Sequence, residues 1–323
     1  MTRLTAAAAV AAALSLAAPA VGQTTLSLGH ALGPGSHYSV GAVAFKETLE
    51  RLSDGRFLVE EHPSSALGGE RDMIEGLQIG SVDLVITSTG PLGNFVPEVL
   101  VLDLPFLFRD YGHARRTLDG EIGQELLAAI DENDLVGLAW SENGFRHVTN
   151  SVRPVATPAD LAGLKLRTME NRVHMQAFEA LGAAPTPMAW PEVFPALQQR
   201  VVDGQENPIT VITAANLDEV QGYLSLTGHV YSPAAVLASP LVLEGLTDEE
   251  RGWFYEAGRA SAAATRAKVD ELEETGVALL RERGMEVTTD IDKTPFQELA
   301  AASYEAFVAE NGDEMIIRIM SVE

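Results

Sequence analysis

The hydrophobic and polar positions of this chain change period repeatedly, and the changes predict alternating strands and helices. Leu26 and Leu28 alternate with polar residues, as in a half-buried strand, and Ser36 follows a Gly-Pro-Gly turn as a candidate helix cap. We predict, in order, a helix over 38–52, a strand over 56–61, a helix over 70–78, a strand over 82–87, a helix over 113–130, a strand over 135–140 and a polar loop over 141–150. The first half of the chain is therefore of the β-α-β-α-β type.

A second block of the same kind begins after residue 150. Thr157-Pro158 is a helix start, and beyond it we predict a strand over 164–168, a helix through 173–181, a strand over 186–189 and a helix over 191–199. Residues 246–284 are nearly all helix formers without proline, so a single helix there would reach about 55 Å at 1.5 Å per residue. That is longer than one small domain. The alternative is two stacked helices with a kink at Gly258 or Gly276.

The beginning of the chain has the layout of a secretory signal peptide. Arg3 precedes an apolar run over 4–20, which ends in the small residues Ala18-Pro19-Ala20. A membrane anchor is the alternative, but the run is rich in alanine and no stop-transfer flank follows. We expect residues 1–22 to be a cleaved signal peptide and the protein to be periplasmic. Because the chain has no cysteine, it forms no disulfides and carries no lipid on a cysteine.

The net charge of the chain limits the classes of partner that it can bind. Acidic residues number 46 against 22 basic ones, for a formal net charge of −24. Such a surface repels nucleic acid and anionic lipid, so neither is expected as a partner. It also repels anionic ligands at long range, and an acid that binds must therefore meet a local positive site. The few arginines are for this reason the first candidates.

Arg167 is the most informative of these arginines. It ends an otherwise apolar strand, where a buried cation is costly unless an anion neutralises it. A guanidinium offers a carboxylate two parallel donors, which lysine does not. Arg146, in the polar stretch before residue 150, is a second candidate. For both, the alternative is an ion pair with a carboxylate of the same chain.

Several sequence motifs, taken together and in order, carry a family resemblance. They are Leu67-Gly68-Gly69-Glu70, Leu104-Pro105-Phe106-Leu107-Phe108, Glu142-Asn143-Gly144-Phe145-Arg146, Lys165-Leu166-Arg167, the run 181–190, Ala196-Leu197-Gln198-Gln199, the run 202–208 and Thr227-Gly228-His229. The chain resembles the solute-binding proteins of tripartite ATP-independent periplasmic (TRAP) transporters, the DctP-type family. The resemblance covers essentially the whole chain after the signal peptide. Arg200 departs from it, because the family usually has glycine there, and Pro195 is unusual inside its helix.

The resemblance implies roles for four residues of the second block. The arginine at the position of Arg167 makes the paired salt bridge to the ligand carboxylate, and an arginine matching Arg146 assists it. Asn207 hydrogen-bonds the same carboxylate, and Trp190 packs on the ligand body. From the residues alone, Asn207 could equally cap a turn and Trp190 could be core.

The resemblance implies further cleft residues from the first domain. Positions near Glu70, Ser88 and Thr89 typically face the cleft in the family. Glu170, three positions after Arg167, either accepts bonds from ligand hydroxyls or an ammonium, or caps the following helix.

The resemblance also implies a fold: α/β, a two-domain periplasmic-binding-protein fold with a long helix crossing both domains and a ligand cleft between them. We place domain I at 23–145 plus about 231–265, and domain II at 146–230 plus about 266–323. The expected partners are a small carboxylate and the small and large membrane subunits of the transporter, with the receptor itself a monomer.

Other functional classes fit less well. No Gly-x-Ser-x-Gly elbow, His-Glu-x-x-His motif or phosphate loop is present, so we expect no enzyme activity, no cofactor and no metal site. A secreted hydrolase remains the distant alternative. A binding protein for an ATP-driven importer or for a chemosensor would share the fold and cleft. The ligand itself is left open between a sugar acid, a dicarboxylate and a zwitterion, with a slight preference for a hydroxylated acid.

Overall fold

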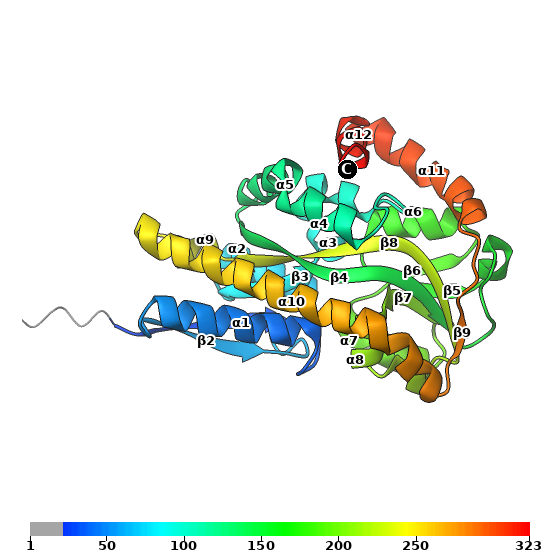
Figure 1. Ribbon diagram of the computed structural model, residues 1–323, viewed down its shortest axis with the longest axis horizontal. Helices are drawn as coiled ribbons and strands as arrows, with labels where there is room; N and C mark the ends of the chain where they lie inside the picture. The colour runs from blue at the N-terminus through cyan, green and yellow to red at the C-terminus, as the bar shows by residue number, and fades with distance from the viewer. Residues whose placement is uncertain (1–21) are drawn as a thin grey trace, which may run out of the picture.

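The computed structural model describes residues 22–323, so the predicted signal peptide lies almost wholly outside the described residues. The chain folds into a single mixed sheet with helices on both sides (Figure 1). The strands are β1 (Thr24–His30), β2 (Phe57–His62), β3 (Leu84–Ser88), β4 (Val136–Asn150), β5 (Lys165–Thr168), β6 (Ala184–Pro187), β7 (Gly204–Pro208), β8 (Tyr223–Ala238) and β9 (Glu286–Thr288). The α/β fold class is confirmed.

The helices alternate with these strands. They are α1 (His37–Leu52), α2 (Glu70–Ile79), α3 (Thr89–Leu92), α4 (Tyr111–Asp119), α5 (Glu121–Asp131), α6 (Arg172–Ala180), α7 (Trp190–Gln198), α8 (Ile209–Ala214), α9 (Pro240–Leu243), α10 (Asp248–Glu282), α11 (Thr294–Asn311) and α12 (Glu314–Met320), with 3-10 turns η1 (Pro97–Asp103), η2 (Pro158–Leu161) and η3 (Leu217–Glu219). No helix among the described residues is long and apolar enough to cross a membrane.

Two long antiparallel strands, β4 and β8, form the middle of the sheet. The strand order is β2-β1-β3-β8-β4-β7-β5-β6, and β9 adds to β8. The parallel strands β1–β3 attach to one end of the β4–β8 pair, and the parallel strands β5–β7 attach to the other end on the opposite side. We call the part built on β1–β3 the first lobe and the part built on β5–β7 the second lobe.

Each lobe is built around apolar clusters, although Val173 of α6, which follows β5, also belongs to the first-lobe cluster around Val85. The first lobe packs apolar side chains on both faces of its sheet, one cluster around Val85 and Leu102 and the other around Leu28 and Phe45. The second lobe does the same on a smaller scale. Helix α12 packs into the first lobe's core, although it lies in the predicted second domain. Because the lobes share one sheet, the predicted domain boundaries stay a prediction.

Helix α10 is one uninterrupted helix of 35 residues that crosses both lobes, as the sequence predicts (Figure 1). Phe254 belongs to a first-lobe core and Leu280 to a second-lobe core. The two glycines at which the sequence allowed a kink, Gly258 and Gly276, instead permit close packing against neighbouring residues. A Cβ on Gly258 would lie 3.0 Å from Leu138 Cβ, and one on Gly276 would overlap Ile209 Cγ2.

Two predicted elements are wrong. The helix over 113–130 is two helices, because Gly120 takes an extended backbone and the next helix packs so closely that a Cβ on Gly123 would overlap the Leu118 carbonyl oxygen. The polar stretch 141–150 is the second half of β4 rather than a loop. Its polar side chains are buried and its backbone pairs with β7 and β8, which a polar pattern alone does not reveal.

Candidate functional site

A small cavity of about 20 Å³ lies between the lobes, where strands from both end. Among the described residues it is lined by Ala31, Leu32, Tyr38, Glu70, Ser88, Asn143, Arg146, Arg167, Met169, Trp190, Asn207 and Val211. This volume is little more than one water molecule requires. The lobes are thus close together, so a solute can enter the cavity only when they move apart.

Arg167 ends β5 at the wall of this cavity and is only 2% exposed. Its Nε and Nη2 donate hydrogen bonds to the Met188 carbonyl oxygen, at 2.9 and 2.6 Å, and its guanidinium carbon lies 5.9 Å from the centre of the Trp190 ring. Within the part of the chain that the structure describes, no carboxylate pairs with it. Burial lowers the pKa of Arg167 to about 10, because a charge without a counter-ion is poorly solvated there.

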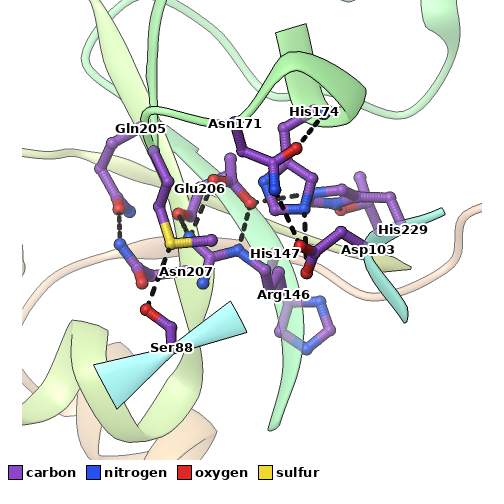
Figure 2. Close-up of polar contacts among 12 residues, drawn as sticks. Ser88, Asp103, Arg146, His147, Asn171, His174, Gln205, Glu206, Asn207 and His229 are labelled. Atoms are coloured by element: carbon purple, nitrogen blue, oxygen red, sulfur yellow. Dashed lines mark hydrogen bonds and ion pairs between the residues drawn. The ribbon is translucent and has the colours of Figure 1, made fainter. Parts of the chain in front are cut away.

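Arg146, the second predicted ligand arginine, is already paired. Its Nε lies 2.5 Å from Glu206 Oε2, its Nη2 lies 2.8 Å from Oε1, and His229 Nε2 lies 3.1 Å from Oε2 (Figure 2). Burial raises the pKa of Glu206, but the Arg146 charge and these hydrogen bonds outweigh it and hold the pKa well below its usual range. One nitrogen, Arg146 Nη1, is buried without a partner among the described residues.

The first lobe supplies an acceptor and a hydroxyl. Glu70 begins α2, and its Oε1 accepts hydrogen bonds from Thr87 Oγ1, Ser88 N and Ser88 Oγ at 3.0, 2.9 and 2.7 Å. These bonds hold the carboxylate against the cavity. The Tyr38 hydroxyl is buried beside it without a hydrogen bond of good geometry to the described residues.

The structure brings six of the eight predicted site residues to the cavity: Arg167, Arg146, Asn207, Trp190, Glu70 and Ser88. Asn207 Nδ2 donates to Gln205 Oε1 at 2.5 Å, which fixes the orientation of the amide. Thr89 and Glu170 do not line the cavity. Thr89 Oγ1 instead donates to Asp103, and the Glu170 carbonyl oxygen accepts from Asn94.

Sequence reasoning missed three polar or adaptable lining residues: Tyr38, Asn143 and Met169. Asn143 Oδ1 lies 2.9 Å from His37 Nε2, so it ties β4 to the start of α1. Asn143 lies within a motif already singled out, and Met169 is two positions after Arg167, so the sequence could have indicated both. Tyr38 lies on a helix face and carries no local signal.

Among the described residues, two arginines and one glutamate line the cavity and Glu206 lies against Arg146, so the charges balance in number but are not evenly paired. Glu206 neutralises Arg146 from behind, and Glu70 stands on the opposite lobe from Arg167. An anion entering the cavity would therefore meet the uncommitted edge of Arg167 and the free Nη1 of Arg146. Such an arrangement suits a ligand that has a carboxylate at one end and a hydrogen-bond donor at the other.

A larger groove of about 560 Å³ lies outside this site, between α5 and α10. Its main cation, Arg266, already holds Asp119 through two bonds of 2.7 and 2.9 Å. The other arginine of this groove, Arg259, is exposed, so the groove lacks the buried cation without a carboxylate partner that distinguishes the cavity between the lobes. No group of histidines, aspartates and glutamates that could hold a metal occurs among residues 22–323.

Comparison with known proteins decides the family. Residues 28–311 match the model of the bacterial extracellular solute-binding protein family 7, DctP. The chain belongs to this family. A TRAP periplasmic solute-binding protein of Polaromonas sp. JS666, solved with bound D-erythronate, superposes with a TM-score of 0.92 at 50% identity, covering 93% of this chain and 99% of that one.

Two further DctP relatives agree. A TRAP solute-binding protein from Bordetella, with density assigned to pantoate, has a TM-score of 0.92 at 52% identity and covers 93% of this chain and 100% of that one. The 2,3-diketo-L-gulonate-binding periplasmic protein YiaO of Escherichia coli K12 is 36% identical over 274 residues, 85% of this chain and 84% of that protein. These comparisons confirm the family resemblance and a solute-binding role, and they leave a hydrolase or an ATP-driven importer without support.

Proposed function

We propose that this DctP protein is the periplasmic receptor of a TRAP transporter and that it binds a short hydroxylated monocarboxylic acid. The observation that carries the proposal is Arg167: a buried guanidinium at the cavity wall with no carboxylate partner among the described residues. A buried cation in this state is stabilised most by an anion.

The acid's carboxylate docks on the second lobe and β4. Arg167 offers the edge that Met188 leaves uncommitted, Arg146 contributes Nη1, and Asn207 and Trp190 border the same space. Charge-assisted hydrogen bonds contribute about 1.5–3 kcal/mol each, so the two arginines account for much of the roughly 8 kcal/mol of a micromolar complex.

The other end of the acid meets the first lobe. There the Glu70 carboxylate accepts hydrogen bonds from ligand hydroxyls, and the Tyr38 hydroxyl completes the wall. A second carboxylate on the ligand would face Glu70 and be repelled, which disfavours dicarboxylates. D-Erythronate and pantoate, the acids reported with the two solved relatives, each have one carboxylate and hydroxyl groups.

Ligand binding and delivery use the movement of the two lobes relative to each other. The acid enters between separated lobes, and contacts from both lobes then favour the closed arrangement by no more than the ligand's preference for it. The closed receptor presents the acid to the small and large membrane subunits. We infer that the protein acts as a monomer in the periplasm after removal of its signal peptide.

The test is a thermal-shift screen of the purified protein with D-erythronate, pantoate and succinate. We expect the two hydroxy acids to stabilise the protein, by about 2.7 kcal/mol at a hundredfold excess over Kd, and succinate to do so far less. Arg167→Ala should abolish the shift. Arg172→Ala removes a nearby, partly exposed arginine outside the cavity and should keep it. Full stabilisation of Arg167→Ala by D-erythronate would refute the carboxylate site.

A further inference from the structure

Three consecutive residues directly after β5, Met169–Asn171, are held by the first lobe. Ser88 Oγ lies 3.5 Å from Met169 Sδ, and Asn94 Nδ2 donates to the Glu170 carbonyl oxygen at 2.7 Å. A Cβ on Gly90 would lie 2.5 Å from Met169 Cε, so the two lobes touch here at the closest distance that glycine permits. This segment begins two positions after Arg167.

The strongest of these contacts is between Asn171 and Asp103. Asn171 Nδ2 donates to Asp103 Oδ2 at 2.7 Å (Figure 2). Thr89 Oγ1 donates to Asp103 Oδ1 at 2.8 Å. Both residues of the pair are fully or almost fully buried, Asp103 at 0% and Asn171 at 1% exposure. Asp103 ends η1 in the first lobe, and Asn171 caps α6 in the second lobe.

The two polar atoms of the Asn171 side chain make hydrogen bonds to different parts of the molecule. Its Oδ1 accepts from the backbone nitrogens of Val173 and His174, at 2.9 and 3.0 Å, and so begins α6. Its Nδ2 serves Asp103 and, at 3.3 Å, the Gly90 carbonyl oxygen. The cap is internal to the second lobe, whereas the amide donor reaches across to the first lobe.

We propose that the Asp103–Asn171 hydrogen bond is an interlobe tie that positions the Arg167 wall of the cavity and sets how readily the lobes close on a ligand. Neither residue lines the cavity, so both act as positioning residues and touch no ligand. Rotation of one lobe against the other moves the two partners apart, because they stand on different lobes. The tie therefore favours the closed arrangement, and part of the binding affinity depends on it.

The ionisation of Asp103 decides the strength of the tie. Burial raises the pKa of Asp103 to about 7, against the hydrogen bonds from Thr89 and Asn171 and the charge of Arg146, which lower it. Glu206 adds to the rise, and the nearest histidine atom, His174 Nε2, lies 3.8 Å from Asp103 Oδ1. Burial lowers the pKa of His174 to about 3, so this ring stays neutral. The measurements below are therefore made at pH 8, where the carboxylate is mostly ionised.

Exchange of the two side chains tests the tie. Asn171→Ser keeps an oxygen that caps α6 but is too short to reach Asp103. Asn171→Asp also keeps the cap and sets two carboxyl groups against each other. The double variant Asp103→Asn/Asn171→Asp restores a donor and an acceptor in reversed order, and the amide oxygen that it places at position 103 can still accept from Thr89. Asn133→Ser is the control, because its amide bond to Ala129 lies within the first lobe.

The first measurement is the affinity for D-erythronate by calorimetry. We expect Asn171→Ser to weaken binding about ten- to hundredfold, Asn171→Asp at least as much, and the exchanged pair to recover most of the loss. Asn133→Ser should bind like the wild type. Unchanged affinity in both single variants, or no recovery in the exchanged pair, would overturn the proposal.

The second measurement is independent of the ligand, whereas the affinity rests on the proposed function. The chain has no cysteine, so spin labels at Ser81→Cys and Gln199→Cys, both exposed, report the distance between the lobes. We expect Asn171→Ser to shift this distance to longer values with and without D-erythronate, and the exchanged pair to shift it back. If the wild type binds none of the acids tested, the proposed ligand fails, and the label distance alone decides the tie.

Discussion

Arg146 and Arg167 are both buried at the same cavity, yet only Arg146 has a carboxylate partner in the described chain. The difference follows from strand position: Glu206 precedes Asn207 on β7, next to β4, and so meets Arg146, while Arg167 turns its bonds to a backbone carbonyl. In the proposed site, Arg167 thus depends on the charge of the ligand, whereas Arg146 shares that charge with Glu206.

Asp103 makes the stability of the fold depend on pH. Its pKa is raised in the folded protein, to about 7, above its value in the unfolded chain. The unfolded chain therefore releases this proton first, and the contribution of Asp103 to stability falls as pH rises from about 4 to about 7 and is constant above. We expect the free energy of unfolding of the wild type, relative to Asp103→Asn, to fall over this interval. Urea denaturation between pH 4.5 and 8 measures it, and a difference that does not vary with pH would contradict the burial of a titrating carboxyl here.

Six of the eight candidates that the sequence motifs and their family resemblance predicted lie at the cavity, and the rest of the site depends on tertiary pairing. Arg167 was a candidate from the residues as well, because a cation at the end of an apolar strand is costly unless an anion neutralises it. The ion pair between Arg146 and Glu206 could not be predicted, because it depends on the register of β4 and β7, which are far apart in sequence. Tyr38 was missed because nothing in its local pattern separates a cavity residue from a core residue.

At the scale of elements, the end of α7 holds a residue unsuited to its backbone. Arg200 follows the helix with a φ of 57°, in the left-handed region that glycine adopts without strain. The family's usual glycine at this position agrees with that geometry. The sequence revealed the departure, and the structure supplies its physical reason.

Arg200→Gly should therefore stabilise the protein. Relief of the strained backbone outweighs the added freedom of the unfolded chain, and we expect a gain of about 0.5–1 kcal/mol in the free energy of unfolding. Gln199→Gly is the matched control, since Gln199 has a φ of −83° and glycine should destabilise there. Urea denaturation compares the two, and equal losses in both variants would contradict the assignment of strain.

At the scale of the whole molecule, the lobes share the β4–β8 pair and α10, while β1–β3 belong to the first lobe and β5–β7 to the second. Strand order β2-β1-β3-β8-β4-β7-β5-β6 carries the chain through both lobes in one sheet. The alternation of strands and helices along the sequence predicted two α/β blocks, but the sequence could not show that their strands join, because 141–150 has the composition of a loop.

We expect the shared sheet to make unfolding a single event. Neither lobe can lose β4 or β8 without exposing the apolar core of the other, so calorimetry should give one transition whose calorimetric and van't Hoff enthalpies agree. D-Erythronate should move this transition as a whole. Two resolved transitions, with the ligand moving one of them, would show lobes that unfold independently.

The ion pair of Arg146 with Glu206 has a consequence for unloading at the membrane. In the proposed site, Arg146 keeps its internal counter-charge when the acid departs, whereas Arg167 has no carboxylate partner among the described residues. Under the proposed function, separation of the lobes thus exposes one unneutralised arginine instead of two, and the emptied receptor keeps most of its binding groups in place.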